Sequence, residues 1–170
     1  MKFIFVGTLD YNKNVSLILK AISKFPNSTL EIVGEGAFKN KLQKEAMKLK
    51  VSNQITWRGF VNNARELIKQ SDCLILASFH EGYGRVCAEA LQEGVPVIMS
   101  EVGCAGELVI HEKNGLVFPV NSLDGLVKSM NRFITDVDLF NRLGQGARET
   151  TFITKEEHMN LIKKSWFITV

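Results

Sequence analysis

The sequence predicts a doubly wound α/β domain, in which a parallel sheet carries helices on both faces. Short apolar runs with the length of buried strands alternate with longer segments whose apolar residues recur at helical spacing. This alternation is typical of parallel strands joined by helices that pack on both sides of one sheet. A chain of 170 residues is long enough for one domain with a substantial core.

The expected strands are short and rich in β-branched or aromatic residues, and they cover residues 3–6, 29–33, 54–57, 73–77, 96–99 and 116–118. The expected helices carry an apolar stripe, and they cover residues 14–25, 38–49, 64–70, 85–93, 122–135, 136–149 and 155–167. A further short helical piece is expected at residues 107–111. Ser122 and Asp136 are suitable N-caps for the helices that they begin.

The loops that follow the strands are the expected place for a ligand. In open α/β sheets, ligands bind outside the carboxyl ends of the strands, close to the point where the strand order reverses. These loops are rich in glycine, and they cover residues 7–13, 34–36, 59–61, 78–84 and 100–106.

The segment H-E-G-Y-G-R-V-C-A-E-A-L-Q-E at residues 80–93 joins one of these loops to a helix. Gly82 and Gly84 would let the backbone approach a ligand, and the free N–H groups of the helix start would favour a phosphate. Glu81 and Glu89 lie on either side of this phosphate site. A ligand with both phosphate and hydroxyl groups, such as a sugar nucleotide, fits that combination. The alternative is an ordinary turn with two solvated glutamates, in which Glu89 pairs with Arg85 one helical turn away.

Composition excludes several other classes of protein. The chain is 45% hydrophobic and 23% charged with a net charge of +3, which is typical of a soluble globular protein. The histidines and cysteines lack metal-ligand spacing, and basic and aromatic residues do not interleave as in a single-strand nucleic-acid site.

The three cysteines are far apart and are expected to be reduced. A cluster of lysines lies mostly on one expected helix, at residues 39, 41, 44, 48 and 50. We interpret it as the solvated face of that helix, with weak attraction to acidic membranes as the alternative. No run is long enough to span a membrane and no signal peptide is recognised, so a cytoplasmic location is expected.

Other nucleotide-binding motifs are missing or misplaced. The first strand leads into G-T-L-D-Y-N-K, which is not the G-x-G-x-x-G of a dinucleotide fold. Gly34 and Gly36 lack the third glycine of that motif and follow the second strand instead of the first. The P-loop and the nucleophile elbow are absent as well.

The segment E-G-Y-G-R-V-C-A-E-A, followed by L-Q-E-G-V-P-V-I, resembles the donor-binding segment of the group 1 (family-4-like) glycosyltransferases. In that family a glutamate is followed, after seven residues, by a second glutamate. Five further stretches resemble family motifs in the same order: G-T-L-D-Y-N-K, L-E-I-V-G-E-G-A-F, I-T-W-R-G-F-V, V-G-C-A-G-E-L-V and N-G-L-V-F-P. Each motif is weak alone, but the ordered set spans nearly the whole chain.

The resemblance implies the C-terminal half of a GT-B glycosyltransferase, a Rossmann-like domain that binds the sugar donor. Residues 1–170 would form this single nucleotide-sugar-binding domain. The N-terminal acceptor-binding domain of the family would precede it and is missing from this chain. The chain would therefore be either a fragment or a stand-alone domain with a separate partner. The full enzyme would be cytoplasmic, with peripheral association at the inner face of a membrane as an option.

The resemblance also implies a nucleotide-diphospho-sugar as the donor substrate, retention of anomeric configuration, and no bound metal or other cofactor. Glu81 would contact the hydroxyls of the transferred sugar, and Glu89 would accept hydrogen bonds from the ribose. Lys13 and Arg85 would stabilise the charge on the leaving diphosphate. The remaining donor-binding positions carried over from the family motifs are Gly7, Thr8, Gly34, Gly36, Gly59, Phe60, Val61, Gly82, Tyr83 and Gly84.

The chain departs from the family pattern at Thr8, where the family has an arginine, and at Asn14, where it has a glycine. Loss of one of two cations would remove a few kcal/mol of transition-state stabilisation, on the order of one electrostatic contact. Arg85 would compensate from the other side of the phosphates. The main hypothesis is the donor-binding and catalytic domain of a retaining transferase that moves a hexose to a glycan or lipid acceptor. The alternative is a non-catalytic nucleotide-sugar-binding domain, or one subunit of a two-chain transferase.

Overall fold

The structure, a computed structural model, describes residues 1–152. It contains one sheet in which every strand pair is parallel. The strands are β1 (Lys2–Val6), β2 (Thr29–Val33), β3 (Ile55–Gly59), β4 (Cys73–Leu76), β5 (Val97–Ser100) and β6 (Gly115–Phe118), in the order β3-β2-β1-β4-β5-β6. Every residue of β4 and β5 is buried, as expected of central strands covered on both faces. The predicted doubly wound parallel sheet is confirmed.

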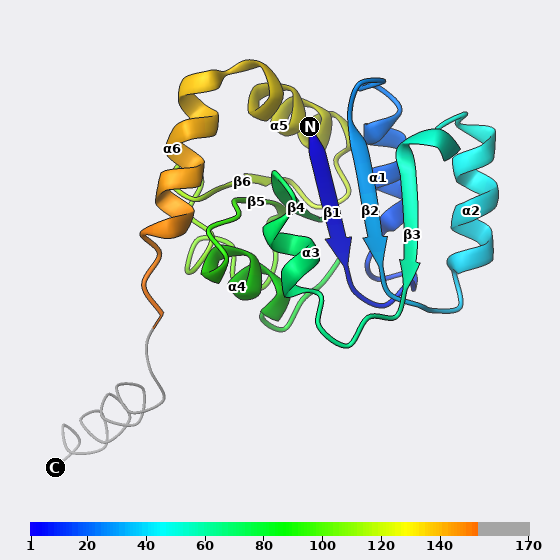
Figure 1. Cartoon of the computed structure of the whole chain (residues 1–170), viewed down its shortest axis with the longest axis horizontal. Helices are drawn as coiled ribbons and strands as arrows, with labels where there is room; N and C mark the ends of the chain where they lie inside the picture. The colour runs from blue at the N-terminus through cyan, green and yellow to red at the C-terminus, as the bar shows by residue number, and fades with distance from the viewer. Residues whose placement is uncertain (153–170) are drawn as a thin grey trace, which may run out of the picture.

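The helices cover both faces of this sheet. They are α1 (Val15–Ile22), α2 (Lys39–Lys48), α3 (Arg65–Lys69), α4 (Arg85–Gln92), α5 (Leu123–Thr135) and α6 (Val137–Arg148), with a short 3₁₀ helix at Ser52–Gln54. In Figure 1, α1 lies behind β2 and β3 and α2 lies beside β3 at the right, whereas α3 lies in front of the sheet. The ring of Phe133 in α5 packs on Phe3 in β1, with centroids 6.1 Å apart. None of the helices in residues 1–152 is both long and apolar enough to cross a membrane.

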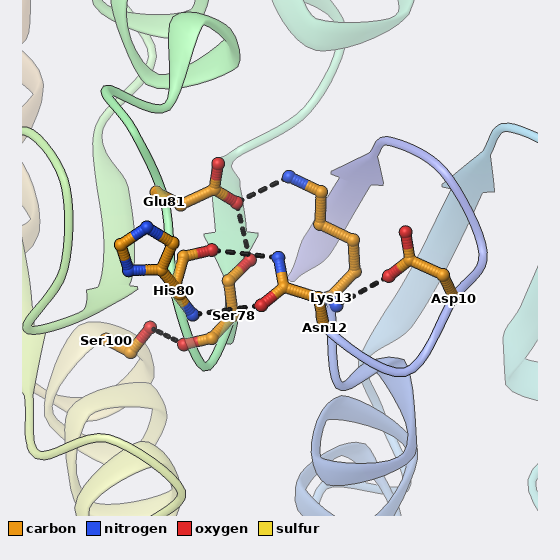
Figure 2. Close-up of polar contacts among 7 residues, drawn as sticks. All are labelled: Asp10, Asn12, Lys13, Ser78, His80, Glu81 and Ser100. Carbon is orange, nitrogen blue, oxygen red and sulfur yellow. Dashed lines mark hydrogen bonds and ion pairs between the residues drawn. The ribbon is translucent and has the colours of Figure 1, made fainter.

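The strand order reverses between β1 and β4, which lie next to each other at the centre of the sheet. The chain leaves β1 toward one edge of the sheet and leaves β4 toward the other, and ligands of such folds bind where the connections separate in this way. Hydrogen bonds of Asn12, in the loop after β1, hold this loop against the loop after β4. The backbone N–H of Phe79 donates to the carbonyl of Asn12 at 2.8 Å, and the Asn12 amide forms two further bonds with the backbone of His80 (Figure 2).

The observed elements lie close to the predicted ones, and both predicted N-caps are confirmed. The Ser122 hydroxyl accepts from the backbone N–H of Gly125 at 3.0 Å, and the Asp136 carboxylate accepts from that of Leu139 at 2.9 Å. The three cysteines are free and buried, as predicted for reduced thiols. The helix predicted at residues 155–167 lies outside the described residues.

The helical piece predicted at residues 107–111 is wrong, because this segment forms a turn followed by isolated bridges at Val109 and His111. The side chain of Asn114 accounts for the difference. Its carbonyl oxygen accepts from the backbone N–H of Ile110 at 2.8 Å, and its amide donates to the carbonyl of Leu108 at 2.9 Å. These bonds satisfy backbone groups that a helix would otherwise pair with each other. Gly106, with a φ of 83°, adds a backbone conformation that does not continue a helix.

Candidate functional site

A cavity of about 390 Å³ lies above the reversal point, with a lining from the loop after β1, the loop after β4 and the start of α4. Its volume is in the range of small-molecule sites. The lining residues are Val6, Gly7, Thr8, Lys13, Glu81, Tyr83, Gly84, Arg85, Val86 and Glu89. The cavity therefore brings together Glu81, Glu89, Lys13 and Arg85, the four charged residues singled out in the sequence.

The start of α4 gives this cavity an anion-binding wall. Gly84 precedes the helix in the left-handed conformation, with a φ of 83°, and no side chain caps the helix start. The first turn also carries no acidic residue, so its positive dipole end is not neutralised there. Arg85 and Val86 line the cavity, and their N–H groups belong to the helix positions that have no intrahelical acceptor. This wall suits a phosphate group.

Glu81 and Lys13 form an ion pair in the lining of the cavity. The Lys13 Nζ lies 2.5 Å from the Glu81 Oε1, and their side chains are 21% and 10% exposed (Figure 2). The same carboxylate oxygen accepts a hydrogen bond from the Ser78 hydroxyl at 2.6 Å. The backbone of Lys13 is fixed in turn, because its N–H donates to the Asp10 carboxylate at 3.0 Å.

Glu89 lies one helical turn after Arg85, and both residues line the cavity. The ion pairs of the described residues do not include one between these two side chains. The alternative in which Glu89 is occupied by Arg85 is therefore not the observed arrangement. In the structure, the Glu89 carboxylate remains available to hydroxyl donors of a ligand.

The other predicted positions do not line the cavity: Gly34, Gly36, Gly59, Phe60, Val61 and Gly82. Gly34 and Gly36 let neighbouring loops touch, since a Cβ at Gly34 would lie 1.9 Å from the carbonyl oxygen of Gly7. The backbone of Gly34 also bonds to the carbonyl of Gly59 at 2.7 Å. These glycines thus join the carboxyl ends of β1, β2 and β3 into one rim, from which the side chain of Phe60 projects with 75% exposure.

Sequence reasoning missed several residues that shape the site. Ser78 holds the carboxylate of Glu81, and Asn12 holds the backbone of His80. A serine and an asparagine in polar loops do not indicate such partners in the sequence. Gly103 is also needed, because its φ is 55° and a Cβ there would lie 2.8 Å from both the Glu81 Cβ and the Tyr83 carbonyl oxygen. The glycine in the V-G-C-A-G motif was the available signal for this close approach.

Two titratable side chains beside the cavity have raised pKa values, those of Tyr83 and Cys87. Burial raises the pKa of the Tyr83 phenol, which therefore stays protonated. A hydrogen bond with Cys104, together with burial, raises the pKa of the Cys87 thiol beneath Gly84. Within residues 1–152, no three His, Cys, Asp or Glu side chains gather as a metal site would need. Within the described part of the chain, the positive groups at the cavity are Lys13, Arg85 and the start of α4.

The fold is that of a doubly wound α/β domain with a cavity at the point where the strand order reverses, and comparison with known proteins gives the family. The family model described as glycosyl transferases group 1 matches residues 1–150, so the chain belongs to that family. A glycosyltransferase of Methanocaldococcus jannaschii described as uncharacterised, MJ1607, is 33% identical over 78% of this chain and 35% of its own length. The glycogen synthase of Mycobacterium tuberculosis is 28% identical over 87% of this chain and 37% of its own. The chain thus spans little more than a third of the length of these relatives.

Solved structures share the fold at lower identity. HepE of Anabaena, crystallised in complex with UDP, superposes with a TM-score of 0.86 at 22% identity, over 97% of this chain and 48% of HepE. The C-terminal domain of the Francisella tularensis group 1 glycosyl transferase LpcC gives a TM-score of 0.79 at 22% identity, over 88% of this chain and 83% of that domain. The predicted Rossmann-like GT-B fold is therefore confirmed.

Proposed function

We propose that this chain is the donor-binding domain of a retaining glycosyltransferase, which moves a hexose from a nucleotide-diphospho-sugar to a glycan or lipid acceptor. The observation that carries the proposal is the single cavity that holds two carboxylates, two cations and an uncapped helix start. A nucleotide-diphospho-sugar has a matching order of groups: hydroxyls on the sugar, a diphosphate, and hydroxyls on the ribose.

Each group of the donor has a chemical partner in this cavity. The diphosphate would lie against the start of α4, with Lys13 and Arg85 on either side. Glu81 would accept hydrogen bonds from the transferred sugar, and Glu89 from the two ribose hydroxyls, which suits a bidentate carboxylate. The exposed rim at Gly59, Phe60 and Val61 would meet the base. The crystal structures of HepE with UDP and with UDP-glucose support a nucleotide sugar as the class of ligand.

The reaction needs stabilisation of the negative charge that develops on the diphosphate as the glycosidic bond breaks. Lys13, Arg85 and the N–H groups of α4 would supply it without a metal ion, because all of them place positive charge at the cavity. The acceptor would be bound by a second domain outside these residues, in the same polypeptide or in a partner chain. The complete enzyme would work in the cytoplasm, at the inner face of a membrane when the acceptor is a lipid.

Thr8 favours a second candidate, a nucleotide-sugar-binding domain that does not catalyse transfer by itself. It lines the cavity at the position where the family has an arginine, so one cation near the phosphates is missing. Both candidates predict binding of the donor, but only the first predicts turnover once an acceptor domain is present. Transfer by the complete protein, lost on Lys13→Met, would decide for the enzyme, whereas donor binding without transfer would decide for the second candidate.

Donor binding can be tested on this chain by thermal unfolding with UDP, GDP and ADP and with their sugar derivatives. A ligand at one hundred times its dissociation constant should add about 2.7 kcal/mol of stability. Glu89→Gln should weaken binding of the nucleotide about tenfold, because a neutral amide forms weaker hydrogen bonds with the ribose. Glu66→Gln, an exposed change on α3 away from the cavity, is the matched control. The proposal would be contradicted if none of the nucleotides stabilised the chain. It would also be contradicted if Glu89→Gln bound the nucleotide as tightly as the wild type does.

A further inference from the structure

Two buried serines connect the centre of the sheet to Glu81. Ser78 follows β4, Ser100 ends β5, and both are 0% exposed. The Ser100 hydroxyl donates to the carbonyl of Ser78 at 2.7 Å, and the Ser78 hydroxyl donates to the Glu81 Oε1 at 2.6 Å (Figure 2). A buried polar group is costly unless it is hydrogen-bonded, and these two bonds satisfy both hydroxyls as donors.

Glu81 has two partners on one oxygen, and they differ in how firmly they are held. Lys13 approaches Oε1 on a flexible four-carbon stem from the lining of the cavity. Ser78 approaches the same oxygen from the core on a side chain with one carbon, while its backbone is fixed by Ser100. Among residues 1–152 no hydrogen bond to Oε2 is formed, so this oxygen remains available to a ligand.

A diphosphate that enters the cavity changes the position of only one of these partners. It carries more negative charge than a carboxylate, so it draws the ammonium of Lys13 away from Glu81. The Ser78 hydroxyl lies in the core and stays where it is. On the opposite side, Gly103 packs against the stem of Glu81, where a Cβ would lie 2.8 Å from the Glu81 Cβ.

We propose that Ser78, held by Ser100, is the positioning residue that keeps Glu81 aimed at the donor sugar while Lys13 moves from Glu81 to the diphosphate. The ion pair between Lys13 and Glu81 is then a contact of the empty site, whereas the bond from Ser78 persists in both states. This inference rests on the proposed function in its account of the ligand, but its structural part concerns the empty protein.

The structural part is tested by a crystal structure of Lys13→Met, which removes the charge and keeps an unbranched side chain that is one atom shorter. Glu81 Oε1 should stay within hydrogen-bond distance of the Ser78 hydroxyl. In the double variant Lys13→Met/Ser78→Ala, the carboxylate should leave this position. A Glu81 side chain that turns away in Lys13→Met would overturn the inference, and no ligand is needed for this result.

The functional part is tested by titrating the chain with UDP and UDP-glucose, and with GDP-glucose and ADP-glucose beside their free nucleotides. With whichever pair the wild type binds, Ser78→Ala should leave the affinity for the nucleotide within twofold. It should lower the affinity for the nucleotide sugar about tenfold, the effect of one hydrogen bond to a charged group. The matched control is Ser71→Ala, because Ser71 is also a buried serine, but it follows α3 and its hydroxyl donates to the backbone carbonyl of Leu67. It should change neither affinity.

The possible outcomes separate this inference from the proposed function. Equal losses of nucleotide and nucleotide-sugar affinity in Ser78→Ala, or no loss of either, would overturn the positioning role. A wild-type chain that binds none of the nucleotides would overturn the proposed function, while the Lys13→Met structure would still decide the role of Ser78. That structure also decides it if Ser78→Ala does not fold.

Discussion

Gly34 is the position where a single added methyl group should disturb both the fold and the site. It follows β2 with a φ of 135°, and its ideal Cβ would lie 1.9 Å from the carbonyl oxygen of Gly7, which lines the cavity. Such contacts below 3.0 Å are essentially never seen, so the two loops must separate by at least about 1.1 Å in Gly34→Ala. The backbone bonds from Gly34 to Gly59 and from Gly7 to Val33 join these loops and would be strained.

The expected loss of stability follows from these contacts. The left-handed backbone costs an alanine about 1–2 kcal/mol, and each weakened backbone hydrogen bond costs about 1 kcal/mol. Gly34→Ala should therefore lower the free energy of unfolding by about 3–4 kcal/mol. For a chain of this size, that corresponds to a fall of about 10 °C in the melting temperature. Nucleotide affinity should fall too, because Gly7 belongs to the cavity.

Two other glycines provide controls that separate strain from collision. Gly106 has a φ of 83° but no heavy atom within 4 Å of its ideal Cβ, so Gly106→Ala should lose about 1 kcal/mol through backbone strain alone. Gly82 has neither a positive φ nor a neighbour within 4 Å, and Gly82→Ala should change stability by less than about 0.5 kcal/mol. Urea unfolding followed by circular dichroism measures all three. If Gly34→Ala is no less stable than Gly106→Ala, the collision with Gly7 does not exist and the reasoning is refuted.

Three further variants test the fold elsewhere. Burial raises the pKa of Glu31, but Lys2 and Arg58 outweigh it, and the net effect is a pKa below the ordinary 4.5. The ion pairs therefore stabilise the protein fully above pH 4.5 and progressively less as the pH falls through the lowered pKa. Glu31→Gln should lose about 1 kcal/mol at neutral pH and less as the pH falls below 4.5, and a loss that does not change with pH would contradict this. Asn114→Ala removes three side-chain hydrogen bonds and should lower the urea-unfolding free energy by about 2 kcal/mol, whereas a loss below about 0.5 kcal/mol would show that water replaces them. Asp136→Ala removes the N-cap of α6 and should lower the free energy of unfolding by about 1 kcal/mol. An unchanged melting temperature would contradict this.

The sequence was sufficient to predict most of the elements of the fold. Strands such as β4 and β5 are continuous apolar runs, and the helices carry apolar stripes, so local pattern and tertiary packing agree. The two N-caps were visible for the same reason, because Ser122 and Asp136 act on backbone groups three residues away. The error at residues 107–111 arose where a side chain, that of Asn114, replaced backbone pairing, which periodicity does not reveal.

The candidate site was predictable only where its residues are close in sequence or belong to a family motif. Glu81, Gly84, Arg85 and Glu89 lie on one loop and one helix start, so their shared cavity follows from local structure. Lys13 was placed there by the family resemblance, since its meeting with Glu81 depends on β1 and β4 being neighbours in the sheet.

The partners behind Glu81 had no such signal. Ser100 reaches the carbonyl of Ser78 across 22 positions of the sequence, because β4 and β5 pair in parallel. Gly103 approaches Glu81 only after the chain has passed through β5. Contacts of this kind depend on strand order and register, which a reading of local pattern does not supply.

The donor site is tested most directly by a crystal structure of this chain with the nucleotide sugar that stabilises it most. We expect the diphosphate against the start of α4, the sugar hydroxyls on Glu81 and the ribose hydroxyls on Glu89. A nucleotide sugar bound elsewhere on the protein, or one that leaves either glutamate without a contact, would contradict it.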